Sequence, residues 1–108
     1  MKRFWLCAVA ILSVCNLSHS DVCRSLCSCY NYAHDVNCGG RGVNSNLLLN
    51  ISFPTNMTRL SLYNNEITHL PENVFSGLGN LRSLSLRWNK ISQLPETIFS
   101  NLTKLTSL

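Results

Sequence analysis

A tandem repeat constrains this chain more than any other feature of its sequence. The stretch LSLYNNEITHLPENVF, which begins at Leu60, recurs as LSLRWNKISQLPETIF from Leu84. Met57, Leu81 and Leu105 mark three equally spaced repeat starts. A period of roughly 20–29 residues with the frame LxxLxLxxN predicts structural units that stack side by side and bury a continuous core between them.

The letters that recur predict a short strand followed by a sharp turn. Leu alternates with polar residues in RLSLY (59–63) and SLSLR (83–87), which is the two-residue period of a strand buried on one side. Asn65 and Asn89 follow at the turn, where an inward amide can supply hydrogen-bond partners to the backbone. The apolar set continues on the return side of each repeat, at Ile67, Leu70, Phe75, Leu78, Ile91, Leu94, Phe99 and Leu102.

The letters that change between the two copies fall mainly on the opposite face of the strands. Residues that this pattern turns toward solvent, or places at the edge of that face, form one predicted ligand-binding face: Arg59, Ser61, Tyr63, Asn64, Ser83, Ser85, Arg87 and Trp88. An exposed Tyr and an exposed Trp beside two Arg residues are a composition favoured at binding hot spots. The alternative is an ordinary solvated sheet face, with Trp88 folded over its rim.

The charge of the chain does not support binding to nucleic acid. The formal net charge is +4, but seven basic and five acidic residues remain after Ser20, which leaves +2. This charge is weak and scattered, unlike the clustered basic surface that contacts nucleic acid. At 108 residues, the chain has room for one small domain at most.

Residues 1–20 have the features of a secretory signal peptide. Lys2 and Arg3 give a positive start, the apolar run FWLCAVAILSV follows, and small residues favour cleavage after Ser20. This apolar run is shorter than the roughly 18 residues that span a bilayer, and no later segment is long enough. The sequence therefore predicts an exported chain without a membrane span. We expect the protein to be secreted, or held at the cell surface if a longer form carries an anchor.

Four cysteines remain after the leader, at Cys23, Cys27, Cys29 and Cys38. An even number in an oxidising compartment indicates two disulfides, and the residues alone leave all three pairings open. A zinc site is the competing interpretation, because four thiolates can hold this metal tetrahedrally. The spacing lacks paired CxxC knuckles, and export argues against free thiolates, so we expect neither a metal nor a cofactor.

The repeats resemble the 24-residue class found in extracellular leucine-rich repeat proteins of animals, LxxLxLxxNxIxxLPxxxFxxLxx. The head, with the spacing Cys23-x3-Cys27-x-Cys29-x8-Cys38, is similar to the cysteine-rich cap that precedes such repeats. FPTNMTRLSL (53–62) resembles the usual junction between this cap and the first strand. Slit-like and Nogo-receptor-like proteins, small proteoglycans and the variable lymphocyte receptors of jawless vertebrates share this combination.

This resemblance implies an α/β solenoid with a short parallel β-sheet on its concave face and a disulfide-bonded N-terminal cap. It also implies a specific pairing of the cysteines, Cys23–Cys29 and Cys27–Cys38. The corresponding organisation is a signal peptide at 1–20, a cysteine-rich cap at 21–56 and leucine-rich repeats at 57–108, of which two are complete and a third is truncated.

The sequence departs from this family pattern in two places. NSNLLLNIS (44–52) is longer than the usual turn ahead of the junction and lacks its proline, although Leu47, Leu48, Leu49 and Ile51 are able to pack beneath the first repeat. The chain also ends within a predicted strand, with no C-terminal cysteine-rich cap. Because about three stacked repeats and a covered end are needed for stability, we expect an N-terminal fragment of a longer protein or a truncated product.

Three candidate N-glycosylation sites follow the leader, at Asn50, Asn56 and Asn101. Asn56 and Asn101 precede apolar positions on the return side, so glycans on them would leave the strand face open.

Catalytic chemistry has little support in the sequence. His34 and His69 are isolated, no Ser lies in a GxSxG motif, and no glycine-rich stretch has the spacing of a phosphate loop. Glu72 and Glu96 are repeat equivalents, and a stacked pair of carboxylates can in principle perform acid–base chemistry. Solvated charge on a convex surface is the simpler interpretation, because nothing in the sequence indicates a pocket around them. We therefore expect a protein that is not an enzyme.

The sequence favours a secreted or cell-surface recognition module that binds an extracellular protein ligand through the concave repeat face. A structural component of the extracellular matrix is the second hypothesis. The third is an antigen-binding immune receptor fragment of the variable lymphocyte receptor type, which would use the same face. Variation among related chains that is confined to this face would favour the third hypothesis.

Overall fold

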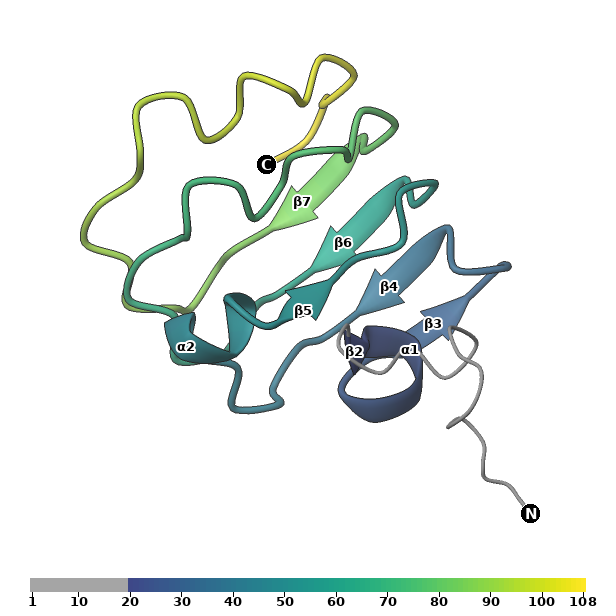
Figure 1. The fold of residues 1–108 in the computed structure, drawn as a ribbon, viewed down its shortest axis with the longest axis horizontal. Helices are drawn as coiled ribbons and strands as arrows, with labels where there is room; N and C mark the ends of the chain where they lie inside the picture. The colour runs from purple at the N-terminus through teal and green to yellow at the C-terminus, as the bar shows by residue number, and fades with distance from the viewer. Residues whose placement is uncertain (1–19) are drawn as a thin grey trace, which may run out of the picture.

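The computed structural model describes residues 20–108, which form two sheets and two short helices (Figure 1). The predicted signal peptide lies outside the described residues, apart from Ser20. The elements follow in the order β2 (Ser20–Asp21), α1 (Val22–Ser25), β3 (Ser28–Tyr30), β4 (Asp35–Asn37), α2 (Ser45–Leu48), β5 (Ile51–Ser52), β6 (Arg59–Ser61) and β7 (Ser83–Ser85). No helix among these residues is long and apolar enough to cross a membrane.

The main sheet joins the cysteine-rich head to both repeats. Its strand order is β3-β4-β6-β7, and Figure 1 shows the four strands side by side. β3 and β4 are antiparallel, whereas β4, β6 and β7 are parallel, with Val36 opposite Leu60 and Leu60 opposite Leu84. Because each step across the parallel strands equals one repeat period, the head supplies a strand in the same register as the repeats.

The strands predicted at 59–63 and 83–87 are in the right place, although β6 and β7 each have only three residues. Backbone pairing continues beyond them. The N–H of Leu62 donates to the Ser85 carbonyl over 2.8 Å, and the N–H of Asn64 donates to the Arg87 carbonyl over 2.8 Å. The lateral alignment of the two repeats therefore extends through the turn that follows each strand.

The core lies between the strands and the return segments. Its buried repeat residues are Met57, Leu60, Leu62, Ile67, Leu70, Phe75, Leu78, Leu81, Leu84, Ile98 and Leu102. The rings of Phe75 and Phe99 stack across the two repeats, with their centroids 6.4 Å apart. Leu94 is the exception to the predicted apolar set, because 49% of its surface remains exposed.

Two disulfides hold the head together. They join Cys23 to Cys29 and Cys27 to Cys38, which is the pairing that the family resemblance implies. The second bridge connects the segment between α1 and β3 to the residue that follows β4, so it links the neighbouring strands β3 and β4 of the main sheet. A small second sheet, formed by the parallel pair β2 and β5, joins the two ends of the head.

The atypical segment 44–52 contains the short helix α2. Asn44 caps this helix, since its side-chain oxygen accepts a hydrogen bond from the N–H of Leu47 over 2.9 Å. Leu48 is buried and Ile51 packs against the core, as expected, whereas Leu47 and Leu49 are exposed. Successive side chains of a helical turn point in different directions, so this run of three leucines cannot all face one core.

Candidate ligand-binding face

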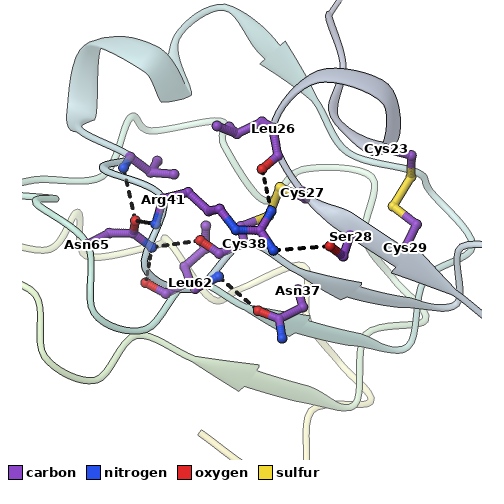
Figure 2. Close-up of a disulfide and its surroundings, with 12 residues drawn as sticks. Cys23, Leu26, Cys27, Ser28, Cys29, Asn37, Cys38, Arg41, Leu62 and Asn65 are labelled. Carbon is purple, nitrogen blue, oxygen red and sulfur yellow. Dashed lines mark hydrogen bonds between the residues drawn. A yellow bond between two sulfur atoms is a disulfide. The ribbon is translucent and has the colours of Figure 1, made fainter.

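Asn65 joins the head to the first repeat. Its side-chain oxygen accepts hydrogen bonds from the N–H groups of Arg41 and Val43, each over 2.9 Å. Its amide nitrogen donates to the carbonyls of Cys38 and Leu62, each over 2.9 Å (Figure 2). The amide also donates to the Tyr63 carbonyl over 3.1 Å, so one buried side chain provides partners for five backbone groups of the head and the first repeat, which confirms the structural role predicted for it.

Asn89 makes the equivalent contacts between the first repeat and the second. It accepts a hydrogen bond from the N–H of Ile67 over 3.0 Å and donates to the carbonyls of Leu62 and Leu86 over 2.9 and 3.1 Å. The two asparagines position the turns that follow β6 and β7. Their side chains are committed to the backbone, so they are not part of the ligand-binding face.

Arg41 is a structural residue that the sequence analysis did not identify. Its guanidinium donates to the carbonyl of Leu26 over 2.7 Å and to Oγ of Ser28 over 3.0 Å, close to the Cys27–Cys38 bridge (Figure 2). These contacts tie the segment after β4 to the start of β3. An isolated arginine carries no pattern from which such a role can be read.

The eight residues predicted to bind a ligand are all at least partly accessible. Five are exposed and three serines are half-buried between the strands: Arg59, Tyr63, Asn64, Arg87 and Trp88, and Ser61, Ser83 and Ser85. The backbone register places Arg59 opposite Ser83 and Ser61 opposite Ser85. These residues alternate along the strands with the buried leucines, so the side of the sheet opposite the core is accessible to a ligand.

Three of the eight residues form a compact cluster at the end of the face. The rings of Tyr63 and Trp88 meet edge to face with their centroids 6.4 Å apart. The guanidinium carbon of Arg87 lies 5.3 Å from the centre of the Trp88 ring, within the range of a cation–π contact. With Ser85, these residues line a hollow of about 320 Å³. Arg59, Ser61, Ser83 and Asn64 do not line it.

Trp88 remains 68% exposed despite these contacts. Its backbone has a φ of 60°, and its repeat equivalent Asn64 has a φ of 58°. A left-handed backbone is uncommon for any residue other than glycine, and especially for a bulky one. Both residues directly precede the asparagine of the turn, so the turn geometry determines where the indole is placed.

The remaining candidate groups lie elsewhere on the surface. Asn50, Asn56 and Asn101 are exposed, as N-glycosylation requires. Glu72 lines a hollow of about 470 Å³ on the return side, but Glu96 does not, so the two carboxylates do not share a pocket. No sequence pattern indicated the hollow beside Glu72. No cluster of three or more metal-ligating side chains lies within residues 20–108.

A family model described as "Leucine rich repeat" matches residues 55–108, which is half of the chain. Comparison with curated proteins gives no match. The matched residues coincide with the two repeats, the two residues before them and the short segment that follows.

Proposed function

The chain belongs to the leucine-rich repeat family, whose repeats typically act as protein-interaction modules, and we propose that it binds an extracellular protein ligand through the outward face of β6 and β7. Solenoids of this kind commonly present an extended concave surface to their ligands. The 24-residue register between adjacent parallel strands supports an α/β solenoid in which this face is the concave one.

The observation that carries the proposal is the cluster of Tyr63, Arg87 and Trp88. Tyr, Trp and Arg are the residues most enriched among binding hot spots, and all three remain exposed although they contact one another. An arginine that already lies on an aromatic ring loses less side-chain freedom when a ligand binds. The cluster therefore has both the composition and the pre-organisation of a binding centre.

Three features support an extracellular location. The leader has the composition of a signal peptide, the described cysteines form two disulfides, and Asn50, Asn56 and Asn101 are accessible. We propose that cleavage follows Ser20, that these asparagines carry glycans, and that residues 21–56 form the cap of the repeats. The protein would then be secreted, or displayed at the cell surface.

The test uses the full chain, produced in secreting cells and screened against a library of extracellular domains. For a partner found in this way, Tyr63→Ala and Arg87→Ala should each weaken binding by about 2 kcal/mol or more. The matched controls Glu72→Ala and Glu96→Ala, which alter the return side, should change binding by less than about 0.5 kcal/mol. Loss of binding in the controls but not in the face variants would refute the assignment.

A further inference from the structure

Tyr63, which lines the hollow, follows a strand that is hydrogen-bonded to the head. The N–H of Cys38 donates to the Ser61 carbonyl over 2.8 Å, and the N–H of Gly40 donates to the Tyr63 carbonyl over 3.1 Å. Gly39 lies between these two hydrogen bonds. It precedes Tyr63 by one repeat period, as Tyr63 precedes Arg87. Gly39, Tyr63 and Arg87 therefore occupy equivalent positions in the head, the first repeat and the second repeat.

The absence of a side chain at Gly39 determines where the Tyr63 ring lies. A Cβ built on Gly39 would overlap the ring of Tyr63, reaching 2.7 Å from Cδ1 and 2.8 Å from Cζ. The ring thus occupies the space that any other residue at position 39 would fill. The same ring also lines the hollow, together with Trp88 and Arg87.

The chemistry of the hollow favours a negatively charged group. Its four lining residues include one cation, Arg87, and no carboxylate. The hydroxyl of Ser85 and the guanidinium of Arg87 are both donors, and a guanidinium matches the two oxygens of a carboxylate. The rings of Tyr63 and Trp88 supply apolar surface for the carbon atoms that precede such a group.

We propose that this hollow binds an acidic side chain of a protein ligand, and that Gly39 keeps the hollow open by accommodating the Tyr63 ring. The proposal rests on the function proposed above, because it names the chemistry recognised at one end of the same face. A sulfated glycan is the less suitable occupant. Polyanions bind clusters of basic residues, whereas one arginine serves this hollow.

The experiment selects peptides from a displayed library of random dodecapeptides on the full chain. Peptides recovered by the wild type should be enriched in Asp or Glu. Their affinity should fall by about tenfold in Arg87→Gln, because a charge-assisted hydrogen bond is lost. Arg59→Gln is the matched control, since it removes a cation from the same face but not from the hollow, and it should change affinity by less than about twofold.

A face-blocking variant, Ser61→Arg, separates the two proposals. Peptides that lose binding in Ser61→Arg but keep it in Arg87→Gln would overturn the hollow and leave the proposed function standing. A selection in which no peptide depends on either residue would overturn both. Binding of a sulfated heparin oligosaccharide that depends on Arg87, with no acidic peptide recovered, would replace the protein ligand with a glycan.

The role of Gly39 has a readout that needs no ligand. After the proposed cleavage behind Ser20, Trp88 is the only tryptophan left in the sequence, so its fluorescence reports on the hollow. Gly39→Ala should push the Tyr63 ring toward Trp88, shift the Trp88 emission and weaken the acidic peptides by at least about threefold. In a Tyr63→Ala background the same substitution should leave the emission unchanged. An equal shift in both backgrounds would show that Gly39 does not act through Tyr63.

Discussion

The first repeat, residues 57–80, and the second, residues 81–104, place the same residue types at different depths. Leu70 is 3% exposed, whereas its equivalent Leu94 is 49% exposed. Ile67 is fully buried, whereas Ile91 is only partly buried. The two repeats have nearly the same inward letters, so the difference comes from what each repeat contacts on its two sides.

The first repeat lies between the head and the second repeat. On its return side it contacts α2, where Oγ of the buried Ser45 donates to the His69 carbonyl over 2.7 Å, next to Leu70. The second repeat packs against the first on one side and, among the described residues, against 105–108 on the other. Leu86, Ile91, Leu94, Phe99 and Leu108 line a mainly apolar hollow of about 520 Å³ there.

The burial of a repeat therefore depends on the segments packed against it as much as on its own sequence. The head acts as the neighbour of the first repeat because β4 and α2 together span its strand side and its return side. The extra residues of 44–52, which depart from the family pattern, supply the α2 part of this cover. Substitutions at equivalent positions of the two repeats should therefore have unequal effects.

The largest difference is expected for the two stacked phenylalanines. Phe75→Ala should lower the free energy of unfolding by about 4 kcal/mol, because Phe75 is almost fully buried and its removal leaves a cavity. Phe99→Ala should cost about 2 kcal/mol, since Phe99 is already partly exposed. Chemical denaturation of both variants measures the difference. Equal losses would contradict the view that neighbours determine burial.

Removal of the bridge between Cys27 and Cys38 should lower the stability of the first repeat toward that of the second. The double variant Cys27→Ser/Cys38→Ser should lose about 3 kcal/mol, because the bridge closes a loop with a sequence separation of 11. Hydrogen exchange should then accelerate at the β6 amides. The control is Cys23→Ser/Cys29→Ser, whose shorter loop of 6 predicts a loss of about 2 kcal/mol. Unchanged exchange at β6 would show that the head does not stabilise this repeat.

Substitution of the two turn asparagines should produce a smaller difference in stability, again with the larger loss in the first repeat. Asn65→Ala should cost about 2 kcal/mol, because it leaves buried backbone groups of the head and of the first repeat without partners. Asn89→Ala should cost about 1 kcal/mol, because Asn89 is more exposed and water can replace part of its hydrogen bonding. Thermal unfolding of the two variants measures this order, and a larger loss for Asn89→Ala would reverse it.

The inward side of each repeat could be predicted from the sequence because strand alternation and the turn asparagine are local patterns. Leu60, Leu62 and Leu84 are buried as predicted. The exposure of Leu94 could not be predicted in this way. Periodicity indicates which way a side chain points, whereas burial also depends on the repeat or head segment that packs against it.

The accessibility of the candidate residues could be predicted from the sequence, whereas their grouping could not. Alternation identifies Tyr63 and Arg87 as outward residues, yet the contact of both with Trp88 depends on the left-handed turn after each strand. The role proposed for Gly39 could not be predicted from the repeats at 57–108 alone, because Gly39 lies in the head. Extending the 24-residue register back from Tyr63 leads to Gly39, so that signal was present in the sequence.

The smallest difference is expected on the outward face, where neither repeat is covered. Tyr63→Ala and Arg87→Ala should each change the free energy of unfolding by about 0.5 kcal/mol or less, because neither side chain belongs to the core. The Tyr63 value should be the larger of the two, since this ring also rests against the backbone of Gly39. Chemical denaturation of the single variants and of the double variant measures both effects and their coupling. A loss above about 2 kcal/mol in either single variant would mean that the cluster is part of the scaffold. Its contacts would then stabilise the fold instead of forming a surface that is free to bind.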